Sequence, residues 1–227
     1  MKISEIFYSI QGEGTLLGVP SVFVRTSGCN LRCVWCDTPY TSWAPEGGDM
    51  TVDQIVESVG KFPAEHVVVT GGEPMIAPQV VELTERLRER GLHITIETAG
   101  TVHAPVACDL MSISPKLKNS VPLERDGGRW AAQHERTRWQ PAVLKRLVST
   151  YEYQLKFVMA DPSDVGEVEE MRKALSAPRA KVLLMPEGTN AETIRQRGLW
   201  LAEICKEHGY RFSPRLHVDL WGDKRGV

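Results

Sequence analysis

The sequence predicts an α/β fold in which a mostly parallel sheet closes part of a barrel, an abridged (β/α)6-type arrangement of the TIM-like kind. Two observations lead to this prediction: short runs of apolar, β-branched residues recur along the chain, and segments with helical periodicity separate them. The chain has 227 residues, of which 42% are hydrophobic and 25% charged, with a net charge of −2. We therefore expect one globular domain, residues 1–227, and no general affinity for nucleic acid.

Six runs form the expected strands, and each run is nearly continuous in apolar residues. Runs of this kind are typical of strands that are buried on both faces of a parallel sheet. The runs span residues 21–27, 66–71, 93–98, 107–114, 153–160 and 180–186.

Helical patterns occupy the intervals between these runs. Thr51 and Gln54 form a capping-box pattern at the start of the first helix. The next helix follows Pro78, with apolar residues on one face, and Gly91 stands just past its end as a left-handed cap. Further helices are expected near 164–175 and 191–208, which gives about six β/α repeats.

One segment, residues 118–141, interrupts this alternation. It is strongly charged, poor in aliphatic residues and longer than most connections between elements. We expect a surface excursion or a partly ordered lid within the single domain.

Polar or glycine-rich residues follow several of the expected strands. The sequences at these strand ends are TGGE at 70–73, ETAG at 97–100, SPK at 114–116 and MPEG at 185–188. Because parallel strands end at the same rim of a sheet or barrel, these residues are predicted to converge on one site.

Three cysteines, Cys29, Cys33 and Cys36, have the spacing C-x3-C-x2-C, so one short loop can present three thiolates to a small inorganic centre. Thiolates are soft ligands that suit iron–sulfur clusters and zinc. A structural zinc site takes four protein ligands, and no fourth one lies nearby. A four-iron cluster held by three cysteines instead keeps one iron open for a substrate or cofactor. The residues alone leave a cluster, a zinc site and merely clustered thiols as alternatives.

The remaining cysteines, Cys108 and Cys205, are unclustered and are expected to be buried as small hydrophobes. An odd number of cysteines suits a reducing compartment better than a disulfide framework. The N-terminus has no apolar signal-peptide core, and no later run approaches the ~18 apolar residues of a membrane span. We therefore expect a cytoplasmic protein without a membrane partner.

The segment CNLRCVWC resembles the signature of the radical S-adenosylmethionine (SAM) superfamily, in which an aromatic residue, here Trp35, commonly precedes the last cysteine. Residues 71–73, Gly-Gly-Glu, stand where that superfamily has a glycine-rich motif after the next strand. The resemblance implies an abridged radical SAM core, a 4Fe-4S cluster on the three cysteines, and SAM chelated to the open iron. A zinc-stabilised binding module without catalysis is the alternative from a different class.

Residues 6–38 and 216–227 resemble the opening and the ending of the 7-carboxy-7-deazaguanine synthase family. The resemblance covers the whole chain and is vague only across 118–141. It implies a lyase that contracts the ring of 6-carboxy-5,6,7,8-tetrahydropterin by a radical route, assisted by magnesium, with loss of ammonia, on the way to queuosine and related deazapurines. A glycyl-radical activating enzyme, which is also short and has the same cysteine spacing, lacks the QGEG opening.

The resemblance also assigns roles to single residues. Arg25 would grip the substrate carboxylate, and the Thr38 hydroxyl would ligate magnesium. From the residues alone, the alternatives are a structural ion pair for Arg25, a helix cap for Thr38 and a polar turn for residues 11–14. Further substrate contacts are implied for Ile10, Gln11, Gly12, Glu13 and Thr70, and cofactor contacts for Asp37, Gly72, Glu73, Ser114, Pro115, Lys116, Met185, Pro186, Glu187 and Gly188.

The same resemblance implies two protein partners, a second copy of the chain in a homodimer and a reducing protein such as flavodoxin or ferredoxin. Met185 departs from the pattern, because some relatives have glutamine there. Any hydrogen bond to the cofactor ribose or adenine at this position must therefore come from the backbone.

Overall fold

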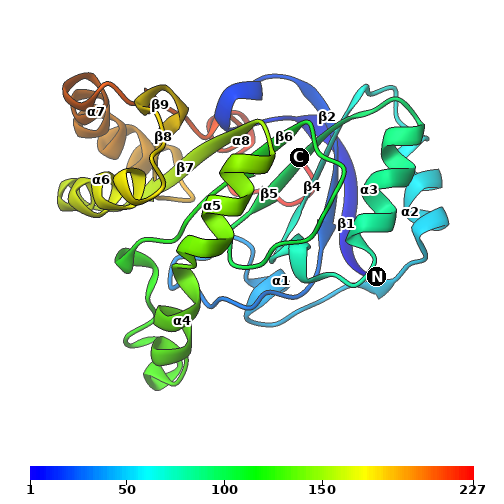
Figure 1. The fold of residues 1–227 in the computed structure, drawn as a ribbon, viewed down its shortest axis with the longest axis horizontal. Helices are drawn as coiled ribbons and strands as arrows, with labels where there is room; N and C mark the ends of the chain where they lie inside the picture. Colours follow the sequence, from blue (N-terminus) through cyan, green and yellow to red (C-terminus); the bar gives the residue numbers. More distant parts are fainter.

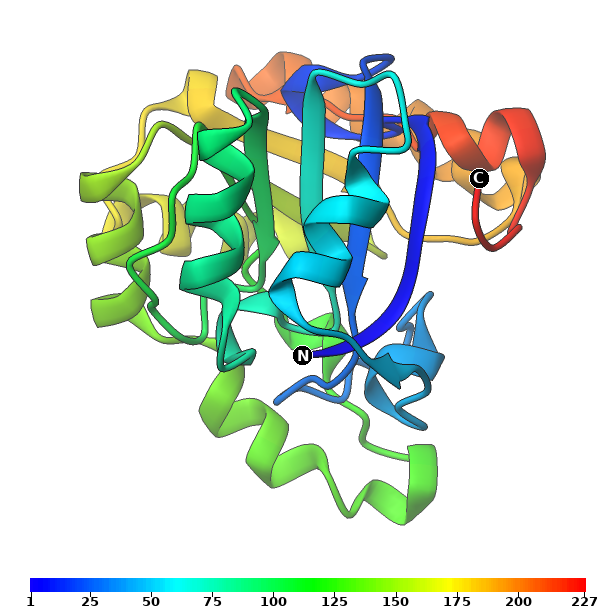
Figure 2. The same cartoon turned by 90° about the vertical axis from the view of Figure 1, so that its right-hand side faces the viewer.

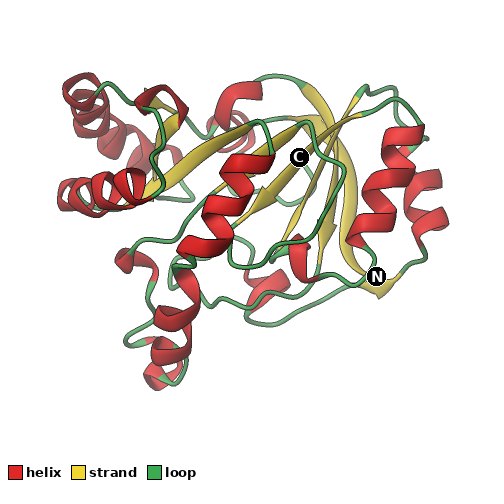
Figure 3. Cartoon of the chain, viewed as in Figure 1, coloured by secondary structure: helices red, strands yellow, loops and turns green.

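A single nine-stranded sheet runs through the molecule in the order β3-β1-β2-β4-β5-β6-β7-β8-β9 (Figures 1 and 3). The computed structural model describes every residue from Met1 to Val227. All neighbours from β2 to β9 pair in parallel, whereas β1 is antiparallel to both β2 and β3. The edge strands β3 and β9 do not pair with each other, so the barrel is only partly closed, as predicted.

All six predicted strands are present, and three further strands were not predicted. The new ones are β1, which pairs antiparallel and is only partly buried, and the two-residue strands β3 and β9. The strands are β1 (Lys2–Ile10), β2 (Pro20–Thr26), β3 (Gly48–Asp49), β4 (His66–Gly71), β5 (His93–Thr98), β6 (Leu110–Ile113), β7 (Tyr153–Met159), β8 (Val182–Pro186) and β9 (Arg211–Phe212).

Two predicted helix signals are confirmed, the capping box at the start of one helix and the glycine after the end of the next. Thr51 Oγ1 accepts the Gln54 N–H at 3.2 Å while Gln54 Oε1 accepts the Thr51 N–H at 2.9 Å, and Gly91 has a φ of 74° just after its helix. The helices are α1 (Pro39–Ser42), α2 (Val52–Val59), α3 (Val80–Glu89), α4 (Ala131–Arg138), α5 (Pro141–Thr150), α6 (Val165–Ala174), α7 (Ala191–His208) and α8 (Leu216–Trp221). No helix lies between β5 and β6, so the expected six β/α repeats are incomplete there, because residues 99–109 are too few for a helical crossover. No helix is both long enough and apolar enough to span a membrane.

The two faces of the sheet have different chemistry. Helices α2, α3 and α5 (Figures 1 and 2), together with α6 and α7, cover one face, and a core of 34 buried apolar residues fills the space beneath them. Side chains alternate along each strand, so every second residue points to the opposite, inner face. In β7, Leu155 and Phe157 join the core whereas Lys156 faces inward. The strands are buried on both faces, as predicted, but the inner face carries polar and charged side chains among its apolar ones.

Candidate active site

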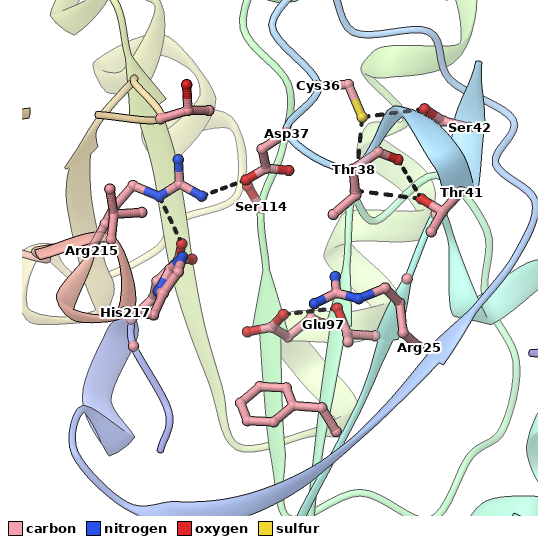
Figure 4. Close-up of a pocket in the computed structure, with 18 of the residues that line it drawn as sticks. Arg25, Cys36, Asp37, Thr38, Thr41, Ser42, Glu97, Ser114, Arg215 and His217 are labelled. Atoms are coloured by element: carbon pink, nitrogen blue, oxygen red, sulfur yellow. Dashed lines mark hydrogen bonds and ion pairs between the residues drawn. The ribbon is translucent and has the colours of Figure 1, made fainter. Parts of the chain in front are cut away.

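The inner face of the sheet forms the floor of a cavity of about 490 Å³. This volume is ordinary for a small-molecule site. Three chain regions complete its walls: the cysteine loop (residues 29–37, between β2 and α1), the turn after β1, and the last residues of the chain, 222–227. Figure 4 shows Arg215 and His217 facing Arg25 and Thr38 across this space, with Glu97 at its floor.

All three predicted cysteine ligands line the cavity. Cys36 Sγ lies 3.2 Å from Ser42 Oγ, and Cys29 Sγ accepts the Leu31 N–H at 3.4 Å. Burial raises the pKa of the Cys29 and Cys33 thiols to about 12, so both are neutral until a metal displaces their protons. The thiols are not gathered as a ligand set around one ion. Three separate thiols on one cavity wall suit a polynuclear centre better than zinc.

The glycines after β4 let this strand pack against the cysteine loop. A Cβ on Gly72 would lie 2.1 Å from the Gly28 carbonyl oxygen and 2.8 Å from Cys29 Cβ, so no larger residue fits there. Gly71 has a φ of 134°, which an L side chain rarely adopts. The GG pair therefore sets how closely the strand end approaches the loop.

Glu73, predicted to contact the cofactor, has another position in the structure. It is 1% exposed and lies outside the cavity, where its carboxylate accepts hydrogen bonds from Thr98 Oγ1 at 2.8 Å and from the Ala99 N–H at 2.9 Å. Burial raises the pKa of this carboxyl group. In this structure, Glu73 fixes the turn after β5.

A charged network, which we call the charged wall, consists of Glu13, Glu97, Lys156 and Arg215. Lys156 forms an ion pair with Glu13 and lies 3.9 Å from Glu97 Oε1, and Arg215 Nε donates to Glu13 Oε1 at 3.1 Å. Burial alone would raise the pKa of Glu13, but Lys156 and Arg215 hold it well below its usual value. Arg215 also pairs with Asp37 at the end of the cysteine loop, so the two walls meet there.

Glu97 is also a hydrogen-bond acceptor for two predicted substrate residues. Gln11 Nε2 donates to its Oε1 at 3.3 Å, and Thr70 Oγ1 donates to its Oε2 at 2.9 Å. The three side chains come from the turn after β1, from β4 and from β5. They form a polar group that can match the donor and acceptor edge of a planar heterocycle.

Arg25 and Thr38 both line the cavity, as the sequence predicts. Arg25 Nε donates to Glu5 at 2.7 Å, so the structural ion pair exists, and its terminal amino groups remain for a ligand. Thr38 precedes α1, but its side chain makes no capping hydrogen bond; it instead accepts from Thr41 Oγ1 at 3.4 Å. The capping alternative for Thr38 is therefore wrong.

The later predicted cofactor residues divide into two groups. Ser114, Lys116 and Met185 line the cavity, and Lys116 Nζ donates to Ser114 Oγ at 2.8 Å. Glu187 instead pairs with Arg197 of α7. The residues that do not line the cavity are Pro115, Pro186, Glu187 and Gly188.

Sequence reasoning assigned no role to Lys156, Arg215 or His217, all of which line the cavity, and it placed Glu97 only among the converging strand ends. Lys156 carried the clearest signal, because a lone lysine in an otherwise apolar strand is seldom buried without partners. A Cβ on Gly12 would lie 2.1 Å from His217 Nδ1, so glycine at position 12 lets α8 approach the turn after β1. Arg215 and His217 stand far along the chain, and only the fold brings them here.

Residues 23–117 match the Radical SAM superfamily. A 7-carboxy-7-deazaguanine synthase of Halobacterium salinarum is 48% identical over 98% of this chain and 91% of its own length. The enzyme of the same name from Rhodopirellula baltica is 44% identical over 100% of this chain and 89% of its own. The chain belongs to the 7-carboxy-7-deazaguanine synthase family.

The crystal structure of QueE from Escherichia coli is similar to this fold, with a TM-score of 0.69 at 26% identity, covering 95% of this chain and 94% of that one. Family membership confirms the predicted fold class, the radical SAM enzyme of lyase type, and its 4Fe-4S cluster and SAM cofactors. The alternatives of a zinc-stabilised binding module and of a glycyl-radical activating enzyme are therefore wrong.

Proposed function

We propose that this cavity converts 6-carboxy-5,6,7,8-tetrahydropterin to 7-carboxy-7-deazaguanine with release of ammonia. One observation supports this most strongly: three cysteines and a buried polar recognition surface face the same cavity. The function is that of the relatives named above, which the chain matches over nearly its full length.

The side of the cavity formed by the cysteine loop, which we call the cysteine wall, holds the cofactors. Cys29, Cys33 and Cys36 fit a 4Fe-4S cluster, because all three thiols line the cavity and none is bonded to another cysteine. Gly72 and Lys116 lie on the same wall and are available to SAM. When bound, the cluster and SAM together supply the radical that starts the ring contraction.

The opposite side of the cavity binds and orients the substrate. Gln11, Thr70 and Glu97 present an amide, a hydroxyl and a carboxylate to the pyrimidine edge of the pterin. The free amino groups of Arg25 donate to the substrate carboxylate in a bidentate pair. Thr38 offers a hard oxygen to magnesium, which prefers such ligands.

The charged wall supplies fixed dipoles rather than mobile groups. Lys156 and Arg215 already neutralise Glu13. The charged wall can therefore face the substrate without water molecules to compensate its charge. Residues 222–227 line the cavity as well. The chain thus holds the pterin in one orientation while its ring rearranges.

Two partners complete the proposal. A one-electron donor such as flavodoxin or ferredoxin reduces the cluster, and two copies of the chain associate as a homodimer. The product enters queuosine or a related deazapurine route.

The test uses protein purified without oxygen and reconstituted with iron and sulfide. We expect about four irons per chain, and turnover with reductant and SAM should yield one ammonia and one deazapurine per pterin consumed. Arg25→Lys should raise KM by about tenfold or more, because lysine cannot form the bidentate pair. A loaded enzyme that leaves the pterin unchanged would overturn the assignment.

A further inference from the structure

The cysteine loop has little structure of its own. Within residues 29–37 a single backbone hydrogen bond joins two loop residues, from the Cys36 N–H to the Cys33 carbonyl at 3.3 Å. No helix or strand covers this stretch. The Arg32 guanidinium also donates to the Cys29 and Leu31 carbonyls at 2.7 Å. Other backbone groups of the loop have their partners outside it.

Many of these contacts come from residues 117–138, which we call the clamp segment. His134 Nδ1 accepts the Arg32 N–H at 3.0 Å, and the Ser120 carbonyl accepts the Val34 N–H at 2.8 Å. The Arg125 guanidinium donates to the Val34 carbonyl at 2.8 Å. Polar backbone groups on both sides of Cys33 are thus bound by the clamp segment.

Aromatic contacts extend the same interface. Trp35 Nε1 donates to the Asn119 carbonyl at 3.1 Å, and the Arg125 guanidinium lies 4.0 Å from the ring centre of Trp43. Arg32 lies 4.8 Å from the ring centre of Trp130. In Figures 1 and 2, α4 and its flanking turns project from the main body at the end of the molecule where α1 lies.

The clamp segment is itself fixed to the main body of the fold. Arg138, at the end of α4, is 4% exposed and donates to Glu167 of α6 at 2.8 Å and to the Lys116 carbonyl at 3.0 Å. Glu167 also accepts the Lys118 N–H at 2.8 Å. One glutamate therefore holds both ends of the segment, although α4 has no apolar face to bury.

His134 connects the clamp segment to the loop. Its side chain is buried, and a neutral ring whose Nδ1 accepts a hydrogen bond must carry its hydrogen on Nε2. That hydrogen is directed to Ser120 Oγ at 2.9 Å, and the Ser120 hydroxyl donates to the Leu117 carbonyl at 2.6 Å. Each polar atom of the ring therefore has one partner, which fixes the ring orientation.

We infer that the clamp segment holds the cysteine loop in the conformation that ligates the cluster, with His134 as the positioning residue that binds the Arg32 N–H. The segment is then not a lid over the substrate but a brace behind the ligands. The inference rests on the proposed ligation by the three cysteines and does not depend on the pterin reaction.

The experiment compares His134→Ala and His134→Asn with Gln133→Ala, an exposed neighbour on the same helix. All proteins are loaded anaerobically, and the rate of iron release to a chelator, the EPR spectrum of the reduced cluster and the unfolding midpoint of the metal-free chain are measured. We expect His134→Ala to release iron about 3- to 10-fold faster, the loss that corresponds to one hydrogen bond. His134→Asn keeps an acceptor near the Nδ1 position and should recover most of the difference, whereas Gln133→Ala should match the wild type.

Equal iron release from His134→Ala and the wild type would overturn the inference, as would equal release from the Ala and Asn variants. If His134→Ala does not fold, Arg125→Ala decides, because it removes a clamp contact from a partly exposed side chain; unchanged release then overturns the inference. A wild-type chain that takes up no cluster would instead overturn the proposed ligation. The two failures are therefore distinct.

Discussion

The cysteine wall and the charged wall face each other across one cavity, yet they are held in place in different ways. The charged wall holds itself, because Glu13, Lys156 and Arg215 are partners of one another. The cysteine loop has only one internal hydrogen bond between backbone groups and is bound from behind by the clamp segment. Recognition groups are thus organised before any ligand arrives, whereas the ligating groups reach their full charge only when metal displaces the thiol protons.

This difference predicts that substitutions in one wall affect cluster binding and that substitutions in the other affect the stability of the fold. Damage to the cysteine wall should remove the cluster and leave the fold, since the loop lies outside the main apolar core. Damage to the charged wall should weaken the fold and leave the cluster. The following substitutions test this separation.

The largest effect is expected for Cys33→Ala. It should abolish turnover and lower the iron content to near zero, because the cluster loses one of its three ligands. The unfolding free energy of the metal-free chain should change by only about 1 kcal/mol. Cys205→Ala, at a buried cysteine outside the cavity, is the matched control and should keep its iron. A Cys33→Ala protein with a full cluster would break the comparison.

Lys156→Met should lower the unfolding free energy by about 3 kcal/mol or more, because Glu13 and Glu97 lose a buried cation. The iron content should stay at the wild-type level. Urea denaturation and iron analysis measure the two quantities on the same sample. The double variant Glu13→Gln with Lys156→Met should recover part of the lost stability, and the separation of the walls would be wrong if Lys156→Met lost its cluster first.

Glu13→Gln should change how stability depends on pH. The pKa of Glu13 is lower in the folded chain than in the unfolded chain, so between these two values the unfolded chain binds more protons and stability falls as pH falls. Glutamine removes this contribution. Wild type should exceed the variant by about 1 to 3 kcal/mol above pH 5, and the difference should shrink towards pH 3. A constant difference across this range would contradict the lowered pKa.

The smallest effect is expected for Arg225→Ala, at the mouth of the cavity. Arg225 pairs with Glu5 and Glu46, but its side chain is 43% exposed, so its loss should leave the stability of the fold nearly unchanged. Because residues 222–227 line the cavity, KM for the pterin should rise a few-fold while the iron content stays constant. An unchanged KM would show that the end of the chain does not contribute to pterin binding.

The chemistry of the cysteine wall was visible in the sequence because its residues are close together along the chain. The cysteine spacing and the GG pair needed no knowledge of the fold, and the structure adds only the reason for the pair, which is the close approach of Gly72 to Gly28. The strand positions followed for the same reason, since runs of apolar residues are local signals.

Glu13 and Glu97 were expected at the site, but the pairing of the charged wall was hidden because its partners are far apart along the chain. Glu13 and Arg215 meet only after the sheet has curved and α8 has returned to the turn after β1. Because the runs are nearly all apolar, the sequence did not show which side chains point to the core and which to the cavity. Lys156, for example, points inward between two core residues. The charged composition of 118–141 predicted an excursion. It did not predict that the excursion contacts the cysteine loop, since His134 has the sequence context of an ordinary surface helix.

The contacts around the loop give the protein a built-in optical reporter. Trp35 belongs to the loop, Trp43 Nε1 donates to the Cys33 carbonyl at 3.0 Å, and Trp130 lies beneath Arg32. Half of the six tryptophans of the chain thus surround the cluster ligands. An iron–sulfur cluster absorbs in the near ultraviolet and quenches nearby indole emission by energy transfer. Assembly and loss of the cluster can therefore be followed in real time, without a label, by the fluorescence of the protein itself.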